Sequence, residues 1–212
     1  MAEHVILLHG LWMRGFALAV LHKRLIAAGF RVHRFDYLSV AATQQHILDQ
    51  LRAQLNDLAS DGAVVHLVGH SLGGLLALRA CAQDAGMPAG RVVCLGSPLL
   101  GSAAARNFAA WGRGGQVLLG HNRELLQQGF ARWQGRREVG MIAGRLPLGL
   151  GAMLGHLQGE HDGTVAVAET LLPGLADHCV VESNHMGLLF SADVAQRVET
   201  FLQQGHFPAP KS

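Results

Sequence analysis

The sequence predicts an α/β protein with a doubly wound, mostly parallel sheet of about six strands and helices on both faces. Short apolar runs alternate along the chain with segments whose apolar residues recur at helical spacing, which is typical of parallel strands joined by helices. Most of the short runs are almost continuously apolar, as expected for strands covered on both faces. The expected strands are His4–Leu8, Arg31–Phe35, Val64–Val68, Arg91–Leu95, Glu138–Ala143 and His178–Glu182.

Two of the segments between or after these strands show the helical period clearly. We expect their apolar stripes to face the core, and Ser191 is a suitable N-cap for the second helix. The stripes are Ile47, Leu48, Leu51, Leu55 and Leu58 in the first helix and Phe190, Val194, Val198 and Phe201 in the second.

The composition indicates one globular domain spanning residues 1–212. Half of the 212 residues are apolar, 15% are charged and 27 are glycine, which is enough apolar sequence for a substantial core. The formal net charge of +2 gives no reason to expect nucleic acid or a membrane surface as a partner.

The cysteines and the N-terminus indicate a cytoplasmic protein. Cys81, Cys94 and Cys179 form no CxxC pair, and an odd number of thiols in apolar surroundings is typical of buried free cysteines in a reducing compartment. No signal peptide is expected, because the first apolar run has only the length of a strand. No apolar run has the length of a transmembrane helix.

The segment between the fourth and fifth expected strands differs from the rest. From Leu99 to Arg145 it holds seven arginines and two acids, Glu124 and Glu138, an excess of +5 (7 − 2). Residues 99–135 are a candidate cap over the site, and the arginines lie either on solvated helix faces or on a cap that binds anionic head groups. The glycine-broken apolar segment 146–154 is either part of an acyl pocket or a buried loop.

Residues 69–74 read Gly-His-Ser-Leu-Gly-Gly and lie between an expected buried strand and an expected helix. This strand–turn–helix setting is that of a Gly-x-Ser-x-Gly nucleophile elbow, in which glycines allow strand and helix to approach closely. The pattern makes Ser71 a candidate catalytic nucleophile, with its hydroxyl at the carboxyl end of the sheet.

A serine nucleophile needs a base and an acid that orients the base, from loops at the carboxyl ends of later strands. No aspartate occurs between Asp84 and Asp162, so Asp162 is the first candidate acid and Glu160 the alternative. The histidines beyond Asp162 are His178, at the amino end of the last strand, His185, directly after that strand, and His206, in the tail. Only His185 lies at the correct end, and the order Ser71, Asp162, His185 is the one expected for this elbow.

An oxyanion hole requires two backbone N–H groups near the nucleophile. One donor is expected to be Leu72, directly after the nucleophile, and the other Leu11, in the loop after the first strand. Gly10 allows this loop to approach the substrate closely. Trp12 is either a wall of the acyl pocket or a core aromatic residue.

Together these residues resemble the α/β-hydrolase superfamily, in particular its small lipase and esterase branch. The motifs that carry the resemblance are Val-Ile-Leu-Leu-His-Gly at 5–10, Gly-His-Ser-Leu-Gly-Gly at 69–74, Leu-Gly-Ser-Pro-Leu at 95–99, His-Asp-Gly-Thr-Val at 161–165 and Asn-His-Met-Gly-Leu-Leu at 184–189. The last is similar to the histidine segment of minimal bacterial lipases that lack a large lid. The first expected strand is already the one that bears His9-Gly10, so we expect a departure from the superfamily pattern, a sheet without the two leading antiparallel strands.

The resemblance implies a serine hydrolase of carboxylic esters that acts through an acyl-enzyme on Ser71, with His185 as base and Asp162 orienting it. Small or medium acyl esters, including lipid esters, are the expected substrates, and no metal or organic cofactor is expected. An acyltransferase or thioesterase with the same triad, or a non-catalytic ligand-binding protein on this fold, is the alternative. The oligomeric state is left open.

Overall fold

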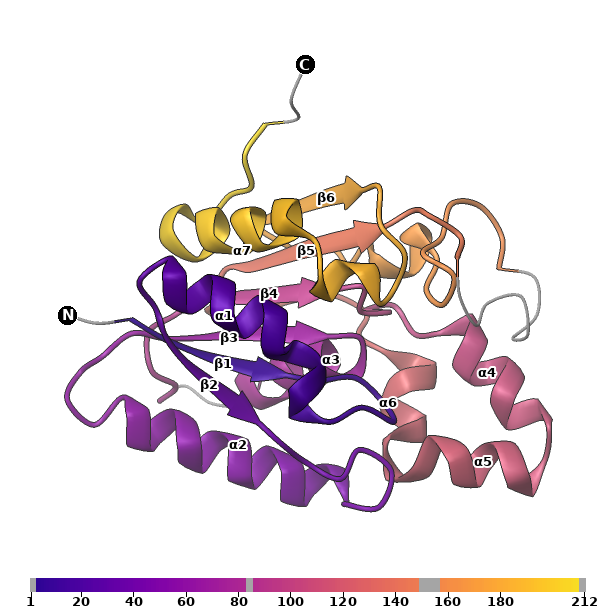
Figure 1. Ribbon diagram of the computed structural model, residues 1–212. Helices are drawn as coiled ribbons and strands as arrows, with labels where there is room; N and C mark the ends of the chain where they lie inside the picture. The colour runs from indigo at the N-terminus through magenta and orange to yellow at the C-terminus, as the bar shows by residue number, and fades with distance from the viewer. Residues whose placement is uncertain (1–2, 83–85, 149–156, 210–212) are drawn as a thin grey trace.

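The computed structural model describes residues 3–82, 86–148 and 157–209. Six strands form one sheet in the order β2-β1-β3-β4-β5-β6, and each neighbouring pair is parallel, which confirms the predicted fold class (Figure 1). The strands are β1 (His4–Leu8), β2 (Arg31–Phe35), β3 (Val65–His70), β4 (Val92–Leu95), β5 (Val139–Gly144) and β6 (Asp177–Val181).

The expected strand β3 was too short at its carboxyl end. The strand continues through Gly69 and His70, which pair in register with Cys94 and Leu95 of β4. The polar and small residues of the motif concealed this extension in the apolar pattern. The strand therefore runs directly into Ser71, with no intervening loop.

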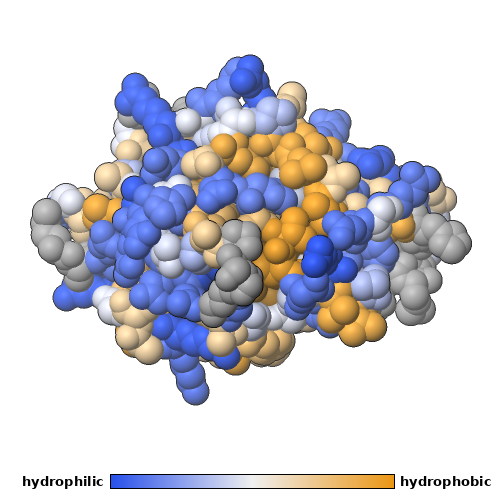
Figure 2. Space-filling model, turned by 90° about the horizontal axis from the view of Figure 1, so that it is seen from above, coloured by the Kyte–Doolittle hydropathy of each residue, from blue (hydrophilic) through white to orange (hydrophobic). Residues whose placement is uncertain are grey.

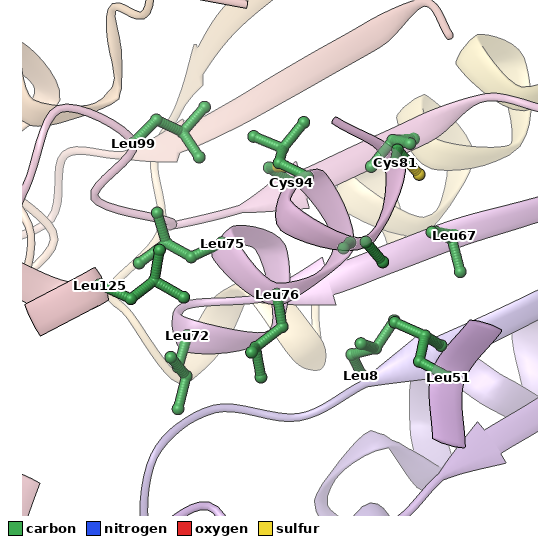
Figure 3. Packing of buried hydrophobic residues seen from close by; sticks show 14 of the residues in the cluster. Leu8, Leu51, Leu67, Leu72, Leu75, Leu76, Cys81, Cys94, Leu99 and Leu125 are labelled. Carbon is green, nitrogen blue, oxygen red and sulfur yellow. The ribbon is translucent and has the colours of Figure 1, made fainter. Parts of the chain in front are cut away.

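Helices cover both faces of the sheet (Figure 1). On one face, α1 and α7 pack over Val5, Leu7 and other apolar strand residues, and on the opposite face α2 and α3 pack over Ile6 and Leu8. Figure 3 shows the cluster on the face covered by α2 and α3, where leucines of α3 lie beside apolar residues of the strands. The helices are α1 (Ala19–Ala27), α2 (Gln44–Leu58), α3 (Leu72–Cys81) and α7 (Ala192–Gln204), with 3-10 turns η1 (Gly15–Leu18), η4 (Val167–Thr170) and η5 (Gly187–Leu189).

Both predicted helical stripes face the core, except for Phe190. In α2 the stripe is buried apart from Leu58, which is half-buried at the helix end, and in α7 Val194, Val198 and Phe201 are fully buried. Ser191 caps α7 by accepting a hydrogen bond from the Val194 N–H. The prediction for Phe190 was wrong: this residue precedes the N-cap, so it does not share the helical face, and it is 50% exposed.

Hydrophobic surface also gathers on one side of the molecule. The view in Figure 2, which looks down on the side formed by β6 and α7, shows a contiguous hydrophobic area bordered by hydrophilic residues. On β6 and on the segment that leads into α7, Val180, Met186 and Phe190 are exposed.

The connection between β4 and β5 lies beyond the carboxyl ends of the strands (Figure 1). It consists of α4 (Ala103–Ala110), α5 (Arg113–Leu119), the 3-10 turn η2 (Gly120–Asn122) and α6 (Arg123–Gln128). In the described ranges, no helix has the length and apolar character needed to cross a bilayer.

Candidate active site

Ser71 occupies a sharp turn between β3 and α3. Its φ of 53° and ψ of −118° lie in a region that non-glycine residues rarely adopt. The flanking glycines explain why the turn can form, because a Cβ on Gly73 would lie 2.5 Å from the Leu8 carbonyl oxygen and one on Gly69 would overlap the Gly73 backbone. The local geometry is thus a tight strand-to-helix turn of the kind that a nucleophile elbow requires.

The loop after β1 lies against this turn. A Cβ on Gly10 would be 3.2 Å from the Ser71 Cβ, so a larger residue would crowd the serine. Beside it, the Leu11 N–H has no protein acceptor in the part of the chain that the structure describes. The Leu72 N–H stands at the first position of α3, where the helix itself offers no acceptor, while the Leu72 side chain is fully buried.

Asp162 and His185 come from loops that follow β5 and β6, and they meet beside the turn that holds Ser71. His185 Nδ1–H donates to Asp162 Oδ2 at 2.7 Å, and Asp162 is 1% exposed. The other carboxylate oxygen, Oδ1, accepts the backbone N–H groups of Thr164 (2.9 Å) and Val165 (2.8 Å). The carboxylate is therefore held in place by its own turn and directs one oxygen at the imidazole.

The alternative acid and bases lie elsewhere. Glu160 is exposed and pairs with Arg145 at 3.5 Å. His178 contacts Thr170 near the amino end of β6, and His206 contacts the Phe207 carbonyl near the C-terminus. The structure thus brings Ser71, Asp162 and His185 to one place, and keeps the alternatives in other surroundings.

Two residues that support this arrangement were missed by sequence reasoning. His70 is buried, and its Nε2–H donates to the His185 backbone carbonyl at 3.0 Å. Burial, together with the neighbouring His185, lowers the pKa of His70 to about 3, which keeps His70 neutral. Gly96 leaves room for the Asp162–His185 contact, because a Cβ there would lie 3.0 Å from Asp162 Oδ2 and 3.1 Å from His185 Nδ1. The available signals were the place of His70 beside Ser71 and that of Gly96 directly after β4.

A cavity of about 480 Å³ opens at Ser71 and His185. Trp12 lines it and is 46% exposed, so it is a wall residue and not a core aromatic. Of the 146–154 segment, Leu148 lines the cavity, and residues 149–154 lie outside the described residues. The remaining lining is mostly apolar and consists of Gly10, Leu11, Met13, Ser102, Ala104, Ala105, Phe108, Leu119, Leu126, Thr164, Val165, Asn184 and Met186.

The arginines of the 99–145 segment do not line this cavity in its described part. Arg145 pairs with Glu160 and Glu182 at the surface, and Arg106 donates to the Gln127 carbonyl. Arg137 departs from both sequence-based interpretations: it is buried and donates to the Val65 and Pro88 carbonyls. Among the described residues, no group of three or more His, Cys, Asp or Glu is arranged to hold a metal ion.

The chain belongs to the α/β hydrolase family, whose profile matches residues 5–209. A solved structure of the mature lipase BlEst2 from Bacillus licheniformis superposes with a TM-score of 0.77 at 20% identity, covering 95% of this chain and 91% of that chain. The esterase Pf2001 from Pyrococcus furiosus gives a TM-score of 0.67 at 18% identity, covering 95% of this chain and 80% of that chain. At these identities the structural likeness establishes the fold. No curated protein sequence matches the chain.

Proposed function

We propose that this α/β hydrolase cleaves carboxylic esters through an acyl-enzyme on Ser71. The observation that carries the proposal is the 2.7 Å contact between Asp162 Oδ2 and His185 Nδ1, beside a serine held in an elbow at the mouth of an apolar cavity. A carboxylate that accepts the Nδ1–H leaves Nε2 of the same ring free to accept a proton from a nucleophile.

In the proposed reaction, Ser71 Oγ attacks the ester carbonyl while His185 Nε2 takes its proton. Negative charge develops on the carbonyl oxygen and is stabilised by the N–H groups of Leu11 and Leu72. His185 then protonates the leaving alcohol. Water, activated by the same imidazole, next attacks the acyl carbon and releases the acid. Asp162 holds the imidazole in its productive tautomer and stabilises the imidazolium that forms.

The cavity lining supports an uncharged, apolar acyl group as the substrate portion bound beside Ser71. His185 is the one ionisable side chain in the described lining, and most other lining groups are aliphatic, aromatic or thioether side chains. A volume of about 480 Å³ lies toward the small end of the range for ligand sites, which favours small or medium acyl chains. The similar structures are those of a lipase and an esterase, which is consistent with this class.

The test is hydrolysis of p-nitrophenyl esters from acetate to palmitate by wild type and Ser71→Ala, with mass spectrometry after treatment with a fluorophosphonate probe. We expect turnover and a single adduct on Ser71 in the wild type only, with kcat lower by on the order of 10⁴–10⁶ in the variant. Normal ester hydrolysis by folded Ser71→Ala would refute the assignment. No adduct and no turnover in folded wild type would favour a ligand-binding role.

Acyl transfer to an alcohol is a second candidate, and the apolar lining of the cavity favours it, because such a lining disfavours water as the acceptor. Product analysis in the presence of added alcohols separates the two reactions. Ester products in excess over free acid would assign the protein as an acyltransferase with the same acyl-enzyme.

A further inference from the structure

Two non-glycine residues of the described chain have a positive φ: Ser71, at 53°, and Trp12, at 58°. For a bulky residue this conformation is an outlier that persists only where the surrounding structure enforces it, and such residues gather at functional sites. The strain at Ser71 presents the proposed nucleophile. The strain at Trp12 has no counterpart in the proposed chemistry and needs a separate explanation.

Three contacts hold Trp12 in this conformation. Its backbone N–H donates to Ser39 Oγ at 3.1 Å, and its indole Nε1–H donates to the Leu118 carbonyl of α5 at 2.9 Å. Its ring also meets Phe108 of α4 edge to face, with 5.6 Å between the centroids and an interplanar angle of 76°. One side chain thus connects the loop after β1 to two of the helices that lie beyond the sheet, α4 and α5.

The residue directly before Trp12 is Leu11, the proposed oxyanion donor. The loop that carries Leu11 leaves β1 at Leu8, and Gly10 lies against Ser71. On the far side of Leu11, the contacts of Trp12 fix the chain. The chain is therefore fixed on both sides of Leu11, by the sheet before it and by α4 and α5 after it. These two anchors together determine the orientation of the Leu11 N–H.

We propose that Trp12 is a positioning residue that couples the seating of α4 and α5 to the oxyanion donor Leu11. This inference rests on the proposed function. It differs from a wall role for Trp12, because a wall affects only substrates that reach it, whereas a displaced donor slows every substrate at the step in which the carbonyl oxygen becomes charged.

The test compares Trp12→Phe with the control Trp111→Phe. Phenylalanine retains an aromatic ring next to Phe108 and removes the indole N–H that binds Leu118. Trp111 is an exposed tryptophan at the end of α4 that also contacts Phe108, so its replacement controls for loss of an indole in the same region. Steady-state kinetics are measured with p-nitrophenyl acetate and p-nitrophenyl octanoate.

For Trp12→Phe we expect kcat to fall on the order of tenfold for both esters, with KM within about twofold of wild type, because misplacement of a catalytic group acts mainly on the transition state. Trp111→Phe should retain wild-type kcat. An effect confined to the octanoate ester, or one on KM alone, would show that Trp12 only lines the cavity wall. Equal kinetics for Trp12→Phe and Trp111→Phe would also overturn the proposal.

A second variant tests the positioning role if Trp12→Phe does not fold. In Trp12→Gly the backbone accepts the positive φ without strain but lacks all side-chain contacts to α4 and α5. We expect folded Trp12→Gly to lose at least as much kcat as Trp12→Phe, and a wild-type kcat would refute the positioning role. If wild type itself shows neither turnover nor a Ser71 adduct, the proposed function has failed instead.

Discussion

Replacing Asp162 by asparagine separates the two tasks that its carboxylate has in the proposed mechanism. Oδ2 accepts the His185 Nδ1–H, and Oδ1 accepts the Thr164 and Val165 N–H groups. The asparagine oxygen can still serve the two backbone groups, which places the side-chain NH₂ opposite His185. Because that NH₂ can only donate, it selects the imidazole tautomer that carries its proton on Nε2.

In that tautomer Nε2 cannot accept the proton of Ser71. The loss in kcat for Asp162→Asn should therefore be on the order of 10⁴, as for the equivalent change in other serine triads. Glu160, the exposed residue that was the alternative candidate for the acid, offers a matched control, since Glu160→Gln loses only a surface ion pair with Arg145. We expect that control to retain wild-type kcat.

Asp162→Ala should be equally inactive but less stable than Asp162→Asn. Alanine leaves the buried Val165 N–H without its acceptor, which costs about 1–3 kcal/mol, while the half-buried Thr164 can be hydrated. For a chain of this size the difference corresponds to about 2–12 °C in Tm. The assays are p-nitrophenyl ester kinetics and thermal unfolding followed by circular dichroism.

Two results would refute this reasoning. A kcat near the wild-type value in Asp162→Asn would mean that another group orients His185. Equal Tm values for the asparagine and alanine variants would mean that the Oδ1 contacts do not stabilise the turn.

Three further predictions concern packing, pH and salt. Gly73→Ala should be strongly destabilising, by about 1–3 kcal/mol or more, because its Cβ would lie 2.5 Å from the Leu8 carbonyl oxygen. The control is Gly114→Ala on α5, whose Cβ would meet nothing within 4 Å and which should be neutral or slightly stabilising. Urea unfolding measures both changes. Burial lowers the pKa of His66 to about 4 and that of His70 to about 3 from 6.5, so the unfolded chain binds more protons below pH 6.5. The free energy of unfolding should then fall as the pH drops from about 6.5 to 4, by up to ~1.4 kcal/mol per pH unit for each histidine. In His66→Asn the free energy of unfolding, measured by urea unfolding at several pH values, should depend less steeply on pH. An unchanged pH dependence would contradict this. For esters with an anionic leaving group, kcat/KM should be the same at low and high salt, since no arginine lines the described cavity, and a steep decrease with salt would instead indicate electrostatic capture.

Local patterns in the sequence were sufficient to predict the sheet and to select the candidate site residues. Parallel strands buried on both faces read as apolar runs, and the elbow is a contiguous motif whose glycines are needed within the same turn. The choice of Asp162 and His185 followed from chain order and from the rule that the carboxyl ends of parallel strands share one edge. Each of these inferences uses residues within a few positions of one another or the direction of a strand.

The tertiary structure decided what depends on contacts between distant segments. Whether Trp12 packs in the core or lines the cavity depends on Leu118, which is 106 positions away, and the role of His70 depends on the His185 carbonyl, 115 positions away. Arg137 is buried because two carbonyls at the amino side of the sheet accept its guanidinium, which no charge pattern reveals. Periodicity and turn motifs specify each element and its exposed or buried face. Which side chains meet across elements is determined only when the sheet has brought those elements together, because such contacts depend on strand order and register.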